Sequence, residues 1–156
     1  MGGDKMANTM VKIDVYLVFH IKSTSVQMHP TDLPRIFEYI GGTLKDLGCL
    51  PIIVGGVSDH IHILTSIAKT ITLSDMMRAI KAGSSKWIKS LSSAYATFAW
   101  QDGYGAFSVS PSIRDKAVDY IRNQARHHQR VSFAEEYKAL LDAYQIPYDE
   151  KFLFND

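Results

Sequence analysis

The sequence predicts an α+β fold in which helices cover one face of a small antiparallel sheet. Apolar side chains recur at every second position in some segments and at every third or fourth position in others, as strands and helices require. These segments follow the order strand, helix, strand, strand, helix, strand, helix. With 156 residues, of which 46% are hydrophobic, the chain is long enough for one domain with a core of its own.

The first half of the chain contains three expected strands and one helix. Strict alternation of apolar and mostly polar side chains over residues 11–21 predicts a half-buried strand. An apolar stripe at helical spacing over residues 33–47 predicts a helix, with Thr31-Asp32 as its cap. The next two strands are expected at residues 49–57 and 59–67, and their short connection predicts a hairpin.

The middle of the chain is expected to add a second helix and the last strand. A helical apolar stripe covers residues 73–91, and strand-forming residues return over residues 99–109. Asp102-Gly103 is a turn signal that interrupts this strand. Earlier in the chain, the pair Gly55-Gly56 indicates a turn or bulge near the end of the second strand.

Two further helices are expected before the C-terminus. The first begins at Ser110-Pro111-Ser112, since proline fits an early helical turn, and it carries an apolar stripe over residues 113–125. The second runs from about residue 132 to residue 144, and Pro147 ends it. The first six elements match the split β-α-β arrangement of ferredoxin-like folds, and a helix that carries Tyr120 follows them.

Composition argues against a membrane-spanning or disulfide-stabilised protein. No run approaches 18 apolar residues, and we expect no secretion signal. The single cysteine, Cys49, allows no internal disulfide, lies among apolar residues as a core position would, and suits a reducing cytoplasm. We take residues 1–156 as one domain, with residues 1–9 as a tag remnant or a disordered N-terminus and Met6 as the natural start.

The net charge of +1 conceals a basic segment in the middle of the chain. Residues 78–130 contain nine Lys and Arg against three Asp and Glu, whereas residues 131–156 contain two against six. A basic segment fits the binding of a polyanion by one face of the protein, although ordinary solvated helix surfaces give the same charge pattern.

His60 and His62 lie two positions apart in the third predicted strand, so both side chains point to the same face. Two neighbouring imidazoles can bind a divalent metal ion, but such pairs also occupy exposed strand positions without one. Imidazole suits zinc and other transition metals, so magnesium would need oxygen ligands beside the pair. Asp59 precedes the pair and is expected on the opposite face, in a structural or supporting role.

Tyr120 and Gln124 lie four residues apart in a predicted helix and therefore project together. They border the apolar stripe, where a tyrosine either packs in the core or reaches a site beside it. A phenol with a pKa of about 10 needs a metal or a base to act as a nucleophile at neutral pH. Two imidazoles, a carboxamide and a phenol are the groups required for a metal-assisted attack of tyrosine on a phosphodiester.

The motifs His60-Ile61-His62 and Tyr120-Ile121-Arg122-Asn123-Gln124 resemble those of the HUH single-tyrosine transposases of the insertion-sequence 200 type and their REP-associated relatives. The resemblance extends from about residue 11 to residue 129. It includes the order of the two motifs within a ferredoxin-like arrangement, and residues 81–86 and 100–104 resemble the segments that connect the motifs.

The resemblance implies a mechanism and a set of partners. His60, His62 and Gln124 would bind Mg²⁺ or Mn²⁺, and Tyr120 would attack the phosphate that the metal polarises. The enzyme would stay linked to the 5′-phosphate of single-stranded DNA and release a 3′-hydroxyl. The family recognises hairpin ends and works as a homodimer, commonly with active sites shared between chains. The resemblance assigns no role to the acidic residues 135–156.

Basic residues of two predicted helices are candidates for contacts with DNA phosphates, which set affinity without reading sequence. They are Arg78, Lys81, Lys86 and Lys89 in one helix, and Arg122, Arg126 and Arg130 in or after the other. Trp87, Trp100 and Tyr104 can stack on unpaired bases, although packing in the core or at a dimer contact is the more common role of such residues.

Two alternatives to a transposase remain open. A zinc-dependent hydrolase of small molecules would use His60 and His62, but the sequence shows no carboxylate or third histidine beside them and leaves Tyr120 without a role. A domesticated, non-catalytic protein would bind hairpin nucleic acid, although all four motif residues are intact.

Overall fold

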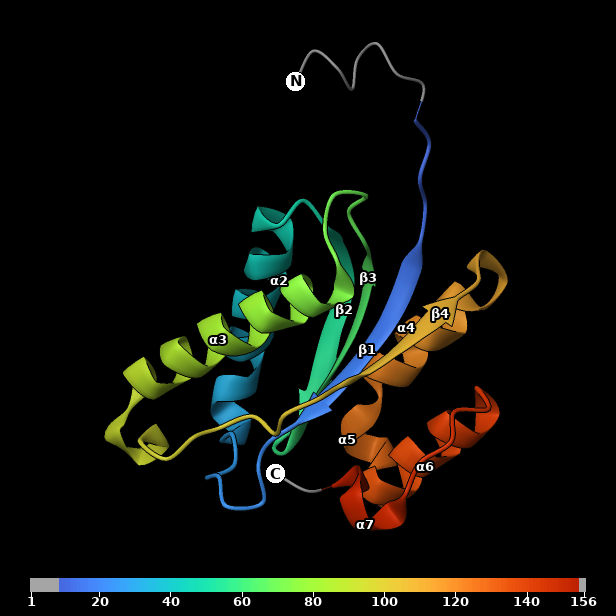
Figure 1. The fold of residues 1–156 in the computed structure, drawn as a ribbon. Helices are drawn as coiled ribbons and strands as arrows, with labels where there is room; N and C mark the ends of the chain where they lie inside the picture. The colour runs from blue at the N-terminus through green and yellow to red at the C-terminus, as the bar shows by residue number, and fades with distance from the viewer. Residues whose placement is uncertain (1–8, 155–156) are drawn as a thin grey trace.

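Four strands form one antiparallel sheet in the computed structural model, which describes residues 9–154 (Figure 1). They pair in the order β2-β3-β1-β4, which is the order of a ferredoxin-like sheet. The strands are β1 (Asp14–His20), β2 (Leu50–Val57), β3 (His60–Ser66) and β4 (Gly105–Val109). The predicted fold class is therefore confirmed. The expected tag remnant and the natural start at Met6 lie outside the described residues.

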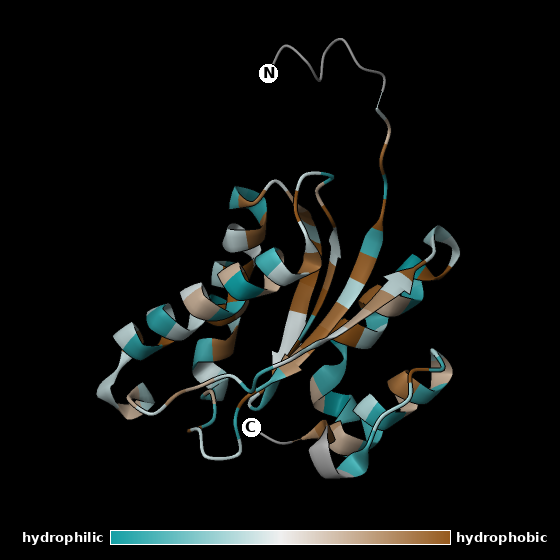
Figure 2. Cartoon of the chain, viewed as in Figure 1, coloured by the Kyte–Doolittle hydropathy of each residue, from teal (hydrophilic) through white to brown (hydrophobic). Residues whose placement is uncertain are grey.

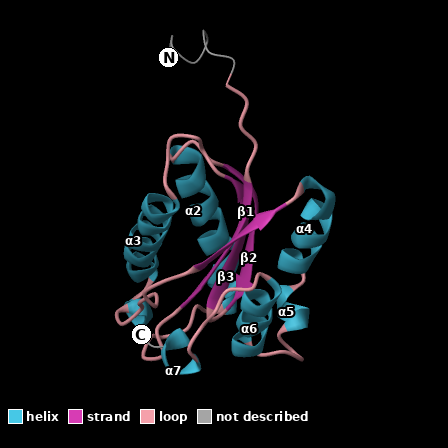
Figure 3. Ribbon diagram, turned by 45° about the vertical axis from the view of Figure 1, so that its right-hand side comes forward, coloured by secondary structure: helices cyan, strands magenta, loops and turns pink. Residues whose placement is uncertain are grey.

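Helices lie on both sides of this sheet (Figure 3). One face is covered by α2 (Leu33–Asp46) and α3 (Leu73–Leu91), and the other by α4 (Arg114–Arg122), α5 (Gln124–His127) and α6 (Phe133–Ala143). The remaining elements are α7 (Glu150–Leu153) and the 3-10 turns η1 (Pro30–Asp32), η2 (Ser93–Tyr95) and η3 (Pro111–Ile113). Within residues 9–154, no helix is both long and apolar enough to cross a membrane.

The alternation of side chains along β1 builds two hydrophobic cores, one on each face of the sheet. Val15, Leu17 and Phe19 pack with α2 and α3, whereas Tyr16 packs on the other face with Ile121 of α4. Figure 2 shows hydrophobic residues, in brown, along the strands. The expectation of a half-buried strand is wrong for β1, because α4, α5 and α6 cover the face that was expected to be open.

The predicted helix over residues 113–125 is divided at Asn123. Asn123 has backbone angles of φ −100° and ψ 22°, and its side-chain amide donates to the carbonyl oxygen of Asp119 at 2.9 Å. A side chain that bonds to its own helix competes with regular helical hydrogen bonding. The chain therefore turns between α4 and α5, and Gln124 begins a new short helix.

Gly55 of β2 allows α4 to approach the sheet closely. A Cβ atom at Gly55 would lie 2.7 Å from Ile121 Cγ2 and 2.9 Å from the carbonyl oxygen of Ile121. A turn or bulge was expected near Gly55-Gly56: the turn follows at Ser58-Asp59, whereas the pairing with β3 shifts earlier, between Pro51 and Ile53. The absence of a side chain at Gly55 thus brings α4, which carries Tyr120, against the sheet.

Candidate active site

The two histidines of β3 lie beneath α4, α5 and α6, and both are completely buried. Their rings are 5.0 Å apart between centroids. Asp59 Oδ1 lies 2.6 Å from Nδ1 of His60, and the hydroxyl of Tyr16 forms a hydrogen bond with Nδ1 of His62. Because each Nδ1 has one of these partners, the Nε2 atoms are the ring nitrogens that face the interior of the site.

The two sequence motifs meet at this place. Gln124 is 1% exposed, and its Oε1 lies 3.1 Å from Nε2 of His60. Its amide nitrogen lies 3.3 Å from the carbonyl oxygen of Tyr120, at the end of α4. The partly exposed ring of Tyr120 lies 6.1 Å from that of His62 between centroids. The structure therefore brings the four predicted site residues together within one chain.

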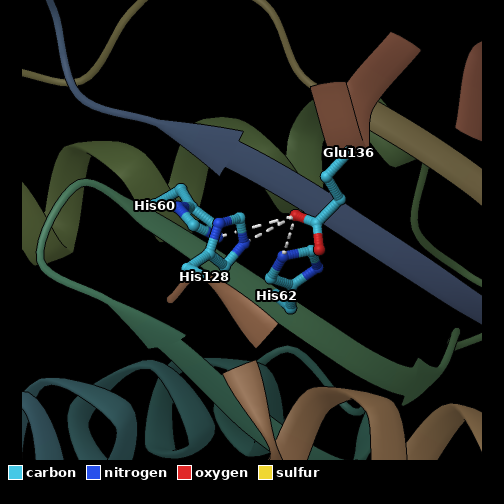
Figure 4. Close-up of side chains that lie close together, drawn as sticks. All are labelled: His60, His62, His128 and Glu136. Atoms are coloured by element: carbon cyan, nitrogen blue, oxygen red, sulfur yellow. Dashed lines mark hydrogen bonds and ion pairs between the residues drawn. The ribbon is translucent and has the colours of Figure 1, made fainter. Parts of the chain in front are cut away.

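Glu136 of α6 is a further site residue that the motifs do not indicate. It is 3% exposed, and its Oε1 lies 3.0 Å from Nε2 of His62 and 3.2 Å from Nε2 of His128 (Figure 4). Its Oε2 accepts a hydrogen bond from the hydroxyl of Tyr120, which also lies 3.1 Å from Nε2 of His127. The carboxylate therefore connects the histidines to the phenol.

One feature of the sequence does point to Glu136. It falls on the apolar stripe of α6 formed by Phe133, Tyr137, Leu140 and Leu141, where a charged side chain is unexpected. His128 carries no comparable signal, since it stands in a basic, polar stretch. The two residues also correct an expectation drawn from the sequence: a carboxylate and a third histidine do lie beside His60 and His62.

Burial sets the charge state of the site. It lowers the pKa of His62 to about 4, so the imidazole is neutral, as metal binding requires. Burial and the hydrogen bond to Glu136 raise the pKa of Tyr120, which keeps the phenol protonated. For Glu136, burial by itself would raise the pKa. The hydrogen bonds from His62 and Tyr120 outweigh burial and lower the pKa of Glu136 to about 2. The site thus holds a buried negative charge.

The arrangement of a tyrosine beside paired histidines and a glutamine on this fold agrees with the comparisons with known proteins. A family model described as "Transposase IS200 like" matches residues 9–124. The chain belongs to the IS200-like transposase family. The match includes both motifs and ends at Gln124, so His128 and Glu136 lie beyond it.

Two solved structures resemble this transposase in fold. A candidate transposase from Deinococcus radiodurans R1 is 17% identical, with a TM-score of 0.59 over 76% of this chain and 95% of the other. A REP-associated tyrosine transposase bound to a REP hairpin is 15% identical, with a TM-score of 0.59 over 80% of this chain and 74% of the other. The comparison with curated proteins finds no match.

An open pocket of about 620 Å³ lies beside the tyrosine of this transposase, along α4 and α5. Tyr120, Arg126 and Arg130 line it, together with Lys116 and His127. Arg126 is exposed there. The pocket therefore joins basic side chains to the phenol, although the acidic Asp119 lines it as well.

The other basic candidates are distributed differently. Arg122 is exposed, and its Nη1 lies 3.5 Å from Oδ1 of Asp119, with which it forms an ion pair. Arg78 and Lys86 are exposed on α3, on the opposite face of the sheet, so the basic residues do not form the single face that the charge pattern predicted. Lys81 donates to the carbonyl oxygen of Gln101 at 2.8 Å and also to that of Gly103, which gives it a role in holding residues 101–103.

The aromatic candidates for base stacking are mostly engaged within the protein. Trp100 is buried and donates through Nε1 to the hydroxyl of Ser84 at 3.0 Å. Trp87 stacks on Tyr39 at 4.7 Å between ring centroids. Tyr104 is exposed at the side of α3. The more common role of such residues, packing within the fold, therefore holds for Trp100 and Trp87.

Proposed function

We propose that the protein cleaves single-stranded DNA at the hairpin ends of a mobile element and rejoins it through a 5′-phosphotyrosine at Tyr120. A divalent metal ion assists the reaction. We propose that the reaction takes place in the cytoplasm, where the DNA of the mobile element lies. The observation that carries the proposal is the contact between two motifs far apart in the sequence. His60 and His62 come together with Gln124 and Tyr120 on the fold of an IS200-like transposase.

The donor groups at the site fit a divalent metal ion. The site offers two imidazole nitrogens, Nε2 of His60 and Nε2 of His62, and one carboxamide oxygen, Oε1 of Gln124, all from buried side chains. Asp59 and Tyr16 orient the two imidazoles from behind. When bound, an Mg²⁺ or Mn²⁺ ion supplies Lewis-acid polarisation of the scissile phosphate.

Tyr120 is positioned to act as the nucleophile. Its hydroxyl already donates to Oε2 of Glu136, so a proton acceptor is in place. As the bond between the phenol oxygen and phosphorus forms, the bond to the 3′-oxygen of the preceding nucleotide breaks. The phenol proton passes by way of Glu136 to solvent, because a carboxylate with a pKa of about 2 does not keep it, and the departing 3′-oxygen takes a proton from solvent. The phosphotyrosine keeps the energy of the broken phosphodiester, so attack by a 3′-hydroxyl reverses the reaction without ATP.

The pocket beside Tyr120 supports a single-stranded substrate. Arg126 and Arg130 provide positive charge where a phosphate chain would enter, which is needed because Glu136 places a negative charge close to the reacting phosphate. The REP hairpin in one of the structurally similar proteins is the basis for proposing a hairpin as the recognised DNA.

We further propose that the protein works as a homodimer in which each chain uses its own active site. The resemblance led us to expect an exchange of tyrosine helices, but Tyr120 already lies beside the histidines of its own chain. Ile121 of α4, which is 1% exposed, packs against Gly55 of the same chain. The helix that carries Tyr120 is therefore buried on the sheet that carries the histidines, and we base the proposal on this position.

Two other functions remain distinguishable by experiment. The cluster of His60, His62, His128 and Glu136 is a donor set that a zinc-dependent hydrolase also uses. The sequence had argued against a hydrolase because no carboxylate or third histidine was evident beside the pair, and the structure removes this objection. The intact site argues against a protein that binds hairpins without cleaving them. Membership of the transposase family and the position of Tyr120 favour DNA cleavage over both.

The test is cleavage of end-labelled single-stranded hairpin DNA by metal-free protein to which Mg²⁺, Mn²⁺ or Zn²⁺ is added. We expect cleavage and a covalent protein–DNA adduct on denaturing gels, neither of which forms in EDTA. A matched reaction with Tyr120→Phe should bind the DNA but form no adduct. Hairpin binding without an adduct in any metal would contradict the proposal in favour of a non-catalytic binder.

A further inference from the structure

We propose that His128 and Glu136 are ligands of the same metal ion as His60 and His62, and that this ligand set selects a transition-metal ion such as Mn²⁺ over Mg²⁺. The inference rests on the proposed function for the presence of a metal at this site. It adds two ligands from the segment that follows Gln124, where the match to the family model ends. Glu136 belongs to the acidic residues 135–156, to which the motifs assign no role.

The distances between the donor atoms are those of a metal centre. One donor atom from each of the four side chains lies within 4.8 Å of the other three. Oε1 of Glu136 lies 3.0 Å from Nε2 of His62, 3.2 Å from that of His128 and 3.7 Å from that of His60 (Figure 4). With metal–ligand bonds of about 2.1 Å, neighbouring ligands stand roughly 3.0–3.5 Å apart, so small shifts suffice to coordinate an ion.

The surrounding contacts hold the donor atoms in position. Nδ1 of His60 is 2.6 Å from Asp59 Oδ1, so the Nε2 lone pair of His60 is directed into the cluster. Phe133, in the first turn of α6, packs against the ring of His60 at 4.5 Å between centroids. The N-cap of α6, Ser132, accepts from the backbone of Glu135 and fixes the start of the helix that delivers Glu136.

The charge of the cluster calls for a cation. Glu136 is almost completely buried, and over the part of the chain that the structure describes its ion-pair partners are all histidines. A buried carboxylate is costly unless a positive charge compensates it. No lysine or arginine among these described residues pairs with it, so a divalent ion at the centre of the imidazoles supplies the missing charge.

The chemistry of the donors determines which ion is preferred. Mg²⁺ favours oxygen ligands and keeps several waters, whereas imidazole nitrogen favours divalent transition metals, whose affinity for such sites rises from Mn²⁺ towards Cu²⁺. Two imidazoles and a carboxamide leave Mg²⁺ acceptable, but three imidazoles and one carboxylate disfavour it. The second oxygen of Glu136 holds the hydroxyl of Tyr120, so a metal bound in this way is also linked to the nucleophile.

The test measures metal binding by the full chain in the absence of DNA. Calorimetric titration of metal-stripped protein should show Mn²⁺ binding at least about tenfold tighter than Mg²⁺ binding. His128→Ala and Glu136→Gln should each weaken Mn²⁺ binding by at least about tenfold. The matched controls are His29→Ala and Glu38→Gln, which change an exposed imidazole and an exposed carboxylate outside the cluster and should leave the Mn²⁺ affinity unchanged.

A second measurement does not depend on the variants folding. X-ray absorption of the Mn²⁺-loaded wild-type protein should count three coordinated imidazoles, and a count of two would overturn the inference. Unchanged Mn²⁺ affinity in folded His128→Ala and Glu136→Gln would also overturn the inference about the ligand set. In that case, cleavage of DNA with Mg²⁺ would still support the proposed function. Mn²⁺ binding through both residues without any DNA adduct would support the ligand set and contradict the proposed function.

Discussion

Nε2 of His60 and Oε1 of Gln124 lie 3.1 Å apart, although 64 residues separate them in the chain. The contact joins a strand in the middle of the sheet to the start of α5, and it depends on α4 packing closely on β2 at Gly55. The sheet thus fixes one half of the site and the helices on its second face fix the other. Changes that separate these halves should impair the site even where no ligand is altered.

Removal of either histidine should abolish cleavage. A substitution His60→Ala or His62→Ala removes an imidazole ligand and displaces the ion from the position in which it polarises the scissile phosphate, so the cleavage rate should fall by at least about a hundredfold. Gln124→Ala should reduce the rate less, by about tenfold, because water can replace a neutral oxygen ligand. Single-turnover cleavage of labelled DNA measures these rates. A near wild-type rate in Mg²⁺ for either histidine variant would show that the metal lies elsewhere.

Arg126 should matter for the approach of the single strand. Because Arg126 lines the pocket beside Tyr120, Arg126→Ala should raise the concentration of unstructured DNA needed for half-maximal adduct formation and should reduce the salt dependence by about one phosphate contact. Arg78→Ala is the matched control, since Arg78 is exposed on α3 across the sheet. Equal effects of the two substitutions would mean that the pocket is not the path of the strand.

Gly55→Ala tests the contact that brings the two halves of the site together. The added methyl group would lie 2.7 Å from Ile121 Cγ2, so α4 must shift and the free energy of unfolding should fall by about 1–3 kcal/mol. Metal affinity should fall with it, because Gln124 follows α4 directly. Gly41→Ala in α2 provides the comparison: among the described residues, no atom outside the adjacent backbone of α2 and the two neighbouring residues lies within 4 Å of the added methyl group. The change should stabilise the helix by about 0.5–1 kcal/mol. Chemical denaturation checks both values, and an undiminished stability of Gly55→Ala would refute the close approach.

Mixing two inactive variants tests whether each chain uses its own site. Tyr120→Phe and His60→Ala would complement each other if tyrosine helices were exchanged, because a mixed dimer would then contain one complete site. The position of Tyr120 beside the histidines of its own chain predicts no recovery of cleavage. Mixed dimers must be demonstrated by differential tagging. Restored adduct formation in them would establish exchange between chains, and a protein that is monomeric at all concentrations would contradict the homodimer.

Local patterns in the sequence predicted most of the fold. The alternation over residues 11–21 and the helical stripes gave the elements of the ferredoxin-like sheet, and the motif spacing grouped His60 with His62 and Tyr120 with Gln124. The covered second face was not predicted, since it depends on where α4 turns after η3. A helix with one apolar stripe packs equally well on its own sheet or on a partner's, and periodicity does not distinguish the two.

Glu136 and His128 could not be assigned to the site from the sequence for a related reason. Their contacts with His60 and His62 arise from the packing of α6 and from the turn after α5, both of which are tertiary effects. A glutamate on an apolar stripe indicates that a charged side chain is buried, but it does not show which residues lie beside it. Only the folded structure shows that the histidines lie beside Glu136.

Covalent attachment of Tyr120 to DNA is the step on which the proposed function depends, and mapping the attached residue tests it. The wild-type protein should be incubated with single-stranded hairpin DNA and metal, digested with nuclease and protease, and examined by mass spectrometry. We expect one modified peptide, in which the oxygen of Tyr120 carries a nucleotide through its 5′-phosphate, and no such peptide from Tyr120→Phe. A nucleotide attached to any other residue, or an equal amount of adduct from Tyr120→Phe, would show that Tyr120 is not the nucleophile.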